Sequence, residues 1–132
     1  MRVTLIQCTN TKRSGTHKAT NLYDESAYFR IMREWAQSTS NPWYILSAKH
    51  GLVNPEQVID DYNQRGLSVK QSKEIARQLH DKGVSEVLIT AGKGYTDQLT
   101  PELERLGIDV IEVCRGKRIG ERMAELKERT NA

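Results

Sequence analysis

YILSAKHGLV, residues Tyr44 to Val53, changes character halfway along its length. Its first four residues suit a buried strand, and they lead directly into Ala48–Gly51, where a lysine, a histidine and a glycine are adjacent. A core strand that ends in a cation and an imidazole raises the question of what lies at its carboxyl end. In a parallel sheet, that end is where the loops form ligand sites.

Three other short segments have the character of strands of the same kind. They are rich in Val, Ile and Leu, as is typical of parallel strands that are buried on both faces. Helical segments lie between the strands, and this alternation indicates a parallel sheet with helices on both faces. We therefore predict a single three-layer α/β domain over residues 1–132, with a parallel sheet of about four strands covered by helices. The predicted strands are Arg2–Gln7, Tyr44–Ser47, Glu86–Ala91 and Asp109–Val113.

Apolar residues at helical spacing identify the helical segments. Residues 24–38 carry one apolar stripe, and residues 72–79 carry another, for which Ser68 is the predicted N-cap. A further helix is predicted to begin with Thr100 as its cap and Pro101 in its first turn. The stripe of the last helix consists of Ile119, Met123 and Leu126.

The composition is that of a globular protein of 132 residues and 15.1 kDa. No apolar run approaches the roughly 20 residues of a membrane span, and the start of the chain is too short in its apolar part for a signal peptide. We therefore expect no membrane partner and a cytoplasmic protein with reduced thiols. Cys8 and Cys114 lie far apart without the spacing of a zinc site, and we predict neither a metal site nor a cofactor. The formal charge of +3 permits a polyanionic partner, although a mildly basic solvated surface is the commoner explanation.

Each predicted strand is followed by a loop that carries cations beside hydroxyl groups, glycine or both. Because the carboxyl ends of parallel strands meet at one edge of the sheet, we expect these loops to come together there. Cations and glycines at such an edge predict an anion site. The four loops are Cys8–Arg13, Lys49–Gly51, Gly92–Tyr95 and Cys114–Arg118.

Each loop also has a purely structural explanation. The hydroxyl and amide side chains after the first strand could make turns and caps. His50 could be a hydrogen-bonded histidine in the wall of the sheet. Gly92–Gly94 could form a turn into a helix, since it lacks the spacing of a P-loop. Arg115–Arg118 could be a solvated helix start, although cations there oppose the helix dipole and a bound anion would relieve that conflict.

Several of these segments together resemble a known family. CTNTK, LYDESAYFR, YILSAKHGLV, VIDDY, AGKGY and GKRIGERMAEL are similar to a group of small phage and bacterial proteins of unknown function that are related to the YaaA-type peroxide-stress proteins. The pieces SAKHGL and G-x-x-I-G-x-R are the most specific. The resemblance implies a compact α/β domain with a basic site at the strand ends, DNA association as in the YaaA branch, and distant similarity to uracil-DNA-glycosylase-like and base-exchange domains. The chain has about half the length of a full YaaA protein.

The leading hypothesis is an enzyme that acts on a nucleobase at its N-glycosidic bond, as an N-glycosidase-like hydrolase or a transferase. Such a reaction needs a carboxylate, a group that bonds the departing base, aromatic walls and phosphate contacts. The predicted catalytic residues are Asp60 and Asp61 as carboxylates and His50 as the acid. A cysteine nucleophile at Cys8, activated by His50, is a further alternative. The predicted substrate-binding residues are Cys8, Thr9, Lys12, Tyr23, Phe29, Ser47, Lys49, Gly51, Tyr62, Gly92, Lys93, Tyr95 and Arg118.

The alternative hypothesis is a non-catalytic protein that binds DNA, RNA or a nucleotide. Lys49, Lys93 and the basic start of the last helix could hold phosphates, and tyrosines could stack on unpaired bases. Carboxylates at the site distinguish the two classes, because Asp60 and Asp61 would repel a polyanion that is merely bound. The oligomeric state and the choice among free nucleotide, DNA and RNA stay open.

Overall fold

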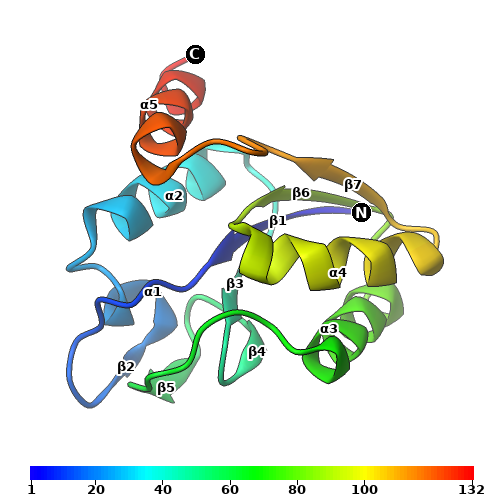
Figure 1. Cartoon of the computed structure of the whole chain (residues 1–132), viewed down its shortest axis with the longest axis horizontal. Helices are drawn as coiled ribbons and strands as arrows, with labels where there is room; N and C mark the ends of the chain where they lie inside the picture. The colour runs from blue at the N-terminus through cyan, green and yellow to red at the C-terminus, as the bar shows by residue number, and fades with distance from the viewer.

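A five-stranded sheet forms the centre of the computed structural model, which describes residues 1–132 (Figure 1). Its strands are β1 (Arg2–Gln7), β3 (Trp43–Ser47), β4 (Gly51–Val53), β6 (Glu86–Thr90) and β7 (Asp109–Glu112). They lie in the order β4-β3-β1-β6-β7, and all neighbouring pairs are parallel except β3 and β4. The predicted α/β class is confirmed. The four predicted strands agree with β1, β3, β6 and β7, with ends that differ by at most one residue.

The fifth strand, β4, was not predicted, and it explains the second half of the opening stretch. β4 pairs antiparallel with β3, and Ser47 lies opposite Gly51. Gly51 has φ +74°, a left-handed conformation that glycine adopts without steric cost. The chain therefore reverses tightly after β3, and Lys49 and His50 occupy the tip of a hairpin at the edge of the sheet.

A second, two-stranded sheet lies beside this edge and was also not predicted. β2 (Thr16–Lys18) pairs antiparallel with β5 (Val58–Asp60), and the short helix α1 (Ala19–Leu22) follows β2. In the register of this pair Thr16 lies opposite Asp60. The small sheet thus carries one of the two predicted catalytic aspartates at the end of β5.

Four longer helices cover the large sheet. They are α2 (Ala27–Ser38), α3 (Val69–Asp81), α4 (Lys93–Arg105) and α5 (Ile119–Thr130). α2 packs against α5 on one face of the sheet, and α3 packs against α4 on the other (Figure 1). The predicted three layers are therefore present.

The helix starts agree with the sequence in one case and differ in another. Ser68 caps α3 as predicted, in a reciprocal capping box with Gln71. The prediction that a helix begins at Thr100 is wrong, because α4 already begins at Lys93 and has Pro101 in its interior. The Thr100 hydroxyl donates to Glu112 on β7 (3.2 Å) instead of capping a helix. The helix continues through Pro101 because the loss of one hydrogen bond is offset by the burial of Leu99 and Leu103 on either side.

The core surrounds β1, whose residues Val3 to Ile6 are all fully buried. Ile45 and Leu46 of β3 and Ile89 of β6 flank them without exposed surface. This burial makes β1 the central strand and fixes the position of Gln7 and Cys8 at its carboxyl end. No helix has the length and apolar character needed to cross a membrane.

Candidate functional site

The carboxyl ends of the four parallel strands lie at one edge of the sheet, so the four predicted loops share that edge. The loop after β1 lies between the loops after β3 and β6, since β1 is between these strands. This central position explains why the residues that follow β1 contact partners from both sides.

Buried hydroxyl groups and a thiol form a cluster at the end of β1, which we call the Cys8 cluster: Cys8, Tyr23, Ser47, Tyr62 and Tyr95. The Cys8 Sγ lies 3.1 Å from the Tyr95 hydroxyl. The Tyr62 hydroxyl lies 2.6 Å from that of Tyr23 and accepts a hydrogen bond from Ser47 Oγ (2.9 Å). Polar contacts thus join residues from β3, from α4, from the end of α1 and from the loops after β1 and β5.

The three tyrosines of the Cys8 cluster stay protonated at neutral pH. Burial raises the pKa of Tyr62 strongly, and the neighbouring Cys8 and Tyr23 raise it further. Burial also raises the pKa of Tyr23 and of Tyr95, whereas the hydrogen bond with Tyr62 partly opposes this effect at Tyr23. These phenols can therefore donate and accept hydrogen bonds, but they do not serve as bases.

Lys12 lies over the Cys8 cluster. Its Nζ is 4.4 Å from the centre of the Tyr62 ring and 5.9 Å from that of Tyr23, within the range of cation–π attraction. Burial lowers the pKa of Lys12; the charge of Arg65 lowers it further, whereas Cys8 and Asp61 act in the opposite direction. Lys12 thus contacts the faces of two tyrosine rings and is influenced by the opposite charges of Asp61 and Arg65.

His50, Lys49 and Asp60 form an ion-paired group next to Tyr62. The His50 Nε2 is 3.0 Å from Asp60 Oδ1, and Lys49 Nζ is 3.1 Å from Asp60 Oδ2. The His50 ring meets Tyr62 edge-on at 5.6 Å between centres, and its backbone N–H donates to Ser47 Oγ (3.0 Å). The hydrogen bond from Lys49, together with that from His50, lowers the pKa of Asp60. Each carboxylate oxygen of Asp60 is therefore engaged, one by His50 and the other by Lys49.

Asp61 differs from its neighbour. It is exposed, its side chain has no hydrogen-bond partner, and its backbone N–H donates to Gly15 (3.1 Å). Its charge acts on Lys12. Of the two predicted carboxylates, Asp61 is the one that is free to meet a ligand.

A pocket of about 310 Å³ opens beside Cys8, and we call it the strand-end pocket. The Cys8 side chain is only 2% exposed and forms part of the wall. The pocket combines two tyrosines, hydroxyl and amide groups and one arginine. Its lining residues are Gln7, Cys8, Thr9, Asn10, Thr11, Ser26, Tyr28, Arg65, Tyr95 and Ile119.

Only Cys8, Thr9 and Tyr95 of the predicted site residues line this pocket. The sequence did not suggest Arg65 or Tyr28 as site residues. A signal for Tyr28 was available, because it lies in the first turn of α2, two residues after the capping Ser26. We expected Lys12, His50, Lys93 and Arg118 to converge on a single cleft, and none of these four lines the strand-end pocket. Lys12 and His50 are brought together at Tyr62, whereas no contact links either of them to Lys93 or Arg118.

Two predicted aromatic walls belong to the core. Phe29 has no exposed surface and packs against Tyr23 with ring centres 5.1 Å apart. Tyr23 has no exposed surface either. Base stacking by Phe29 and Tyr23 was therefore a wrong expectation, because the first turn of α2 places Phe29 beneath the Cys8 cluster, where it supports Tyr23.

The glycines after β6 are already engaged. The Gly92 N–H donates to Gln7 Oε1 (2.6 Å), and Gly94 C=O accepts from the N–H of Leu67 (3.0 Å). The predicted phosphate contact at Gly92 would have to displace Gln7. Lys93 is exposed and forms no ion pair.

The basic loop before α5 is largely neutralised by carboxylates of the strand before it and the helix after it, β7 and α5. Lys117 pairs with Glu125, and Arg115 lies 4.0 Å from Glu112. The backbone N–H of Arg118 donates to Glu121 (3.2 Å) in a capping contact. Of the cations in this loop, only the side chain of Arg118 remains without a carboxylate partner.

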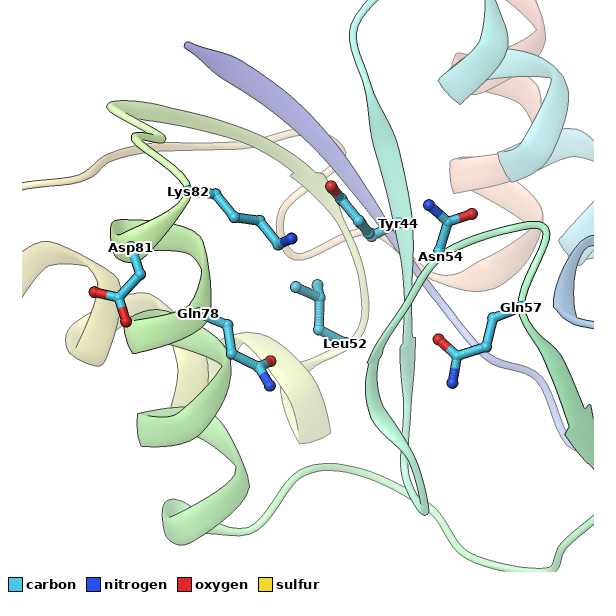
Figure 2. Close-up of a pocket in the computed structure, with 7 residues that line it drawn as sticks. All are labelled: Tyr44, Leu52, Asn54, Gln57, Gln78, Asp81 and Lys82. Carbon is cyan, nitrogen blue, oxygen red and sulfur yellow. The ribbon is translucent and has the colours of Figure 1, made fainter.

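A second hollow, of about 430 Å³, lies away from these strand ends (Figure 2). Tyr44 of β3 and Leu52 of β4 face Gln78 and Lys82 at the end of α3 across this hollow. The Lys82 Nζ is 6.0 Å from the centre of the Tyr44 ring. None of the predicted site residues lines it, so it does not bear on the predicted chemistry.

The fold and these strand ends define an α/β protein with a pocket beside the central strand. A family model described as a family of unknown function (DUF6884) matches residues 3–128, and the chain belongs to this family. The "Uncharacterized protein YfjM" of Bacillus subtilis (strain 168) is 28% identical over 82 residues, which are 56% of this chain and 55% of that protein. The match thus spans about half the length of the relative. No solved structure matches the chain significantly.

Proposed function

We propose that the protein binds a nucleotide, either free or as part of a nucleic acid, in the strand-end pocket. The observation that carries this proposal is the composition of the pocket, in which Tyr28 and Tyr95 lie with Asn10, Thr11 and Arg65 around one space. Aromatic side chains suit the face of a base, amides and hydroxyls suit its polar edge, and a guanidinium suits a phosphate. The volume of about 310 Å³ fits a small ligand.

Action on the N-glycosidic bond is the second candidate, and the geometry of Asp61 favours it. Asp61 is exposed and free beside Lys12, as a carboxylate that stabilises a developing sugar cation would need to be. Asp60 and His50 support it less, since each is held by the other, and none of these three residues lines the pocket itself. Nucleotide binding is therefore the first candidate function and cleavage of the N-glycosidic bond the second, whereas the sequence alone favoured cleavage. The same proposal includes a relation to YaaA-type proteins, association with DNA and a cytoplasmic location.

Calorimetric titration with nucleoside monophosphates and with short single-stranded oligonucleotides tests the binding proposal. Tyr28→Ala should weaken binding about tenfold or more, because loss of one stacking face costs roughly 1–3 kcal/mol. Tyr44→Ala, in the hollow of Figure 2, is the matched control and should bind like the parent. Equal affinities of the two variants would contradict the assignment of the ligand to the strand-end pocket.

Release of free base, followed by chromatography, tests the chemical proposal. Asp61→Asn should abolish release while binding stays nearly intact, because the lost charge acts mainly in the transition state. If the parent releases no base from a broad panel of nucleotides and DNA, and Asp61→Asn only binds them more tightly, the aspartate acts by repulsion alone. The protein is then a binder.

A further inference from the structure

Several cations at the strand-end edge are already paired with carboxylates. Lys49 pairs with Asp60, Lys117 with Glu125, and Arg13 with Asp24. Arg65 forms neither an ion pair nor a hydrogen bond, and it is the one cationic side chain that lines the strand-end pocket. An unpaired guanidinium at a pocket that holds no other charged group has a free capacity for an anion.

The chain on the carboxyl side of Arg65 is fixed against the start of α4. Leu67 is buried, and its N–H donates to Gly94 C=O (3.0 Å). Gly66 has φ +72°, and a Cβ at this position would lie 3.0 Å from the same carbonyl oxygen. A side chain at position 66 would therefore push the loop away from α4. The close approach of Gly66 and Gly94 holds Arg65 at the pocket.

Lys12 provides a second cation without a carboxylate partner, close to the pocket although not part of its lining. Thr11, its neighbour in sequence, lines the pocket, and the charges of Lys12 and Arg65 repel one another, which contributes to the lowered pKa of Lys12. Two cations that repel each other beside a pocket are stabilised when a dianion binds between them. The Thr11 hydroxyl lies in the same pocket and can donate to a phosphate oxygen, whereas the Thr9 hydroxyl already donates to the Thr11 C=O (3.3 Å).

We propose that Arg65, together with Lys12, binds the terminal phosphate of the ligand, so that the strand-end pocket selects nucleoside monophosphates over nucleosides. This inference rests on the proposed nucleotide binding and names its phosphate subsite, which lies at the loops after β1 and β5. The glycines after β6 do not form this subsite, and Ile119 at the start of α5 contributes only an apolar side chain to the pocket. A guanidinium matches two phosphate oxygens at once, and Lys12 adds a point charge.

The test compares each nucleoside with its 5′-monophosphate by calorimetry, and uses inorganic phosphate as a separate probe. Arg65→Ala should weaken monophosphate binding about tenfold to a hundredfold, as expected for a lost charge-assisted contact, and leave nucleoside binding unchanged. Arg65→Lys should recover only part of the loss because it cannot bind two oxygens in the same way. Lys12→Ala should show a smaller loss of the same kind. The matched control is Arg77→Ala, which removes an exposed cation of α3 outside the pocket.

The outcomes separate this inference from the proposed function. If the parent binds neither nucleosides nor monophosphates, the proposed function fails, and this subsite fails with it. If the parent binds both and Arg65→Ala behaves like Arg77→Ala, nucleotide binding stands and the phosphate subsite is wrong. Circular dichroism of each variant confirms that the fold is intact, and a loss of nucleoside affinity equal to that of the monophosphate would also contradict the inference.

Discussion

The two cysteines of this protein lie at two strand ends of the same edge of the sheet. They differ in whether the charged groups around them are paired with one another. Around Cys114 a single carboxylate, Glu125, accepts from the thiol (3.0 Å) and from Arg129 (2.8 Å) and pairs with Lys117. Around Cys8 the polar groups are neutral phenols, and the nearby cations Lys12 and Arg65 have no carboxylate partner.

This difference shows in the pKa values at the Cys114 end. Burial raises the pKa of Cys114 to about 11, and the hydrogen bond with Glu125 contributes to this rise. Hydrogen bonds from Lys117, Cys114 and Arg129 lower the pKa of Glu125 to about 2. The acidic and basic side chains near Cys114 are paired with one another, which is typical of a structural cluster. The cations near Cys8 have no carboxylate partner, which is typical of a binding site.

The largest effect on ligand affinity is expected when the charge of one arginine is reversed, and the two strand ends should respond differently. Arg65→Glu should reduce nucleoside monophosphate affinity by about a hundredfold or more, because attraction for the phosphate becomes repulsion. Arg115→Glu, at the Cys114 end, should change it by no more than a few-fold. Calorimetry of both variants at the same salt concentration measures the contrast. Comparable losses would mean that both strand ends contact the ligand.

A smaller effect is expected from the glycines that shape the two loops. Gly66 and Gly116 both have positive φ, but only Gly66 lies close to another backbone segment. Alanine at either position should lower the free energy of unfolding by roughly 1–2 kcal/mol for the left-handed conformation. Gly66→Ala should also weaken monophosphate binding about tenfold, because the loop that carries Arg65 must shift. Chemical denaturation and calorimetry of the pair check this, and unchanged affinity in Gly66→Ala would show that the Gly66–Gly94 contact does not position Arg65.

The smallest effect concerns stability at the Cys114 end. Glu125→Gln should lower the free energy of unfolding by about 1 kcal/mol at neutral pH, since partly exposed ion pairs contribute little. The pKa of Glu125 is lower in the folded state, so its contribution is complete above about pH 4.5 and disappears as the pH falls towards about 2. Denaturation curves across this range, with Glu128→Gln as the control on the same helix, measure the effect. A difference between parent and Glu125→Gln that persists unchanged at pH 2 would contradict the ion-pair cluster.

The fold followed from the sequence where local pattern and burial agree. β1 was predicted well because all of Val3 to Ile6 are apolar or β-branched and all are buried. β4 was missed because its three residues, which begin with a glycine, are too few to show a period, and its existence depends on pairing with β3. The start of α4 was misplaced because Thr100-Pro101 has the local signature of a helix start, whereas packing of the helix against the sheet extends it back to Lys93.

The candidate site was predicted less completely than the fold, because it depends on contacts between residues that are far apart in the sequence. The sequence indicated the strand-end edge and the residues Cys8, Thr9 and Tyr95. It did not indicate Arg65, because its place at the pocket depends on the approach of Gly66 to Gly94, 28 positions away in the chain. It overvalued the loop before α5, because Glu125 lies on the following helix and neutralises Lys117 only once that helix has formed.

The most direct test of the nucleotide site is a titration of the isotopically labelled protein with a nucleoside monophosphate, followed by the chemical shifts of its backbone and arginine side chains. The account predicts shifts at Thr9–Lys12, at Arg65 and at Tyr95, with the Arg65 guanidinium changing only for the phosphorylated ligand. It predicts no change at Lys117 or Glu125. Shifts confined to the loop before α5, or none at Arg65, would contradict the account.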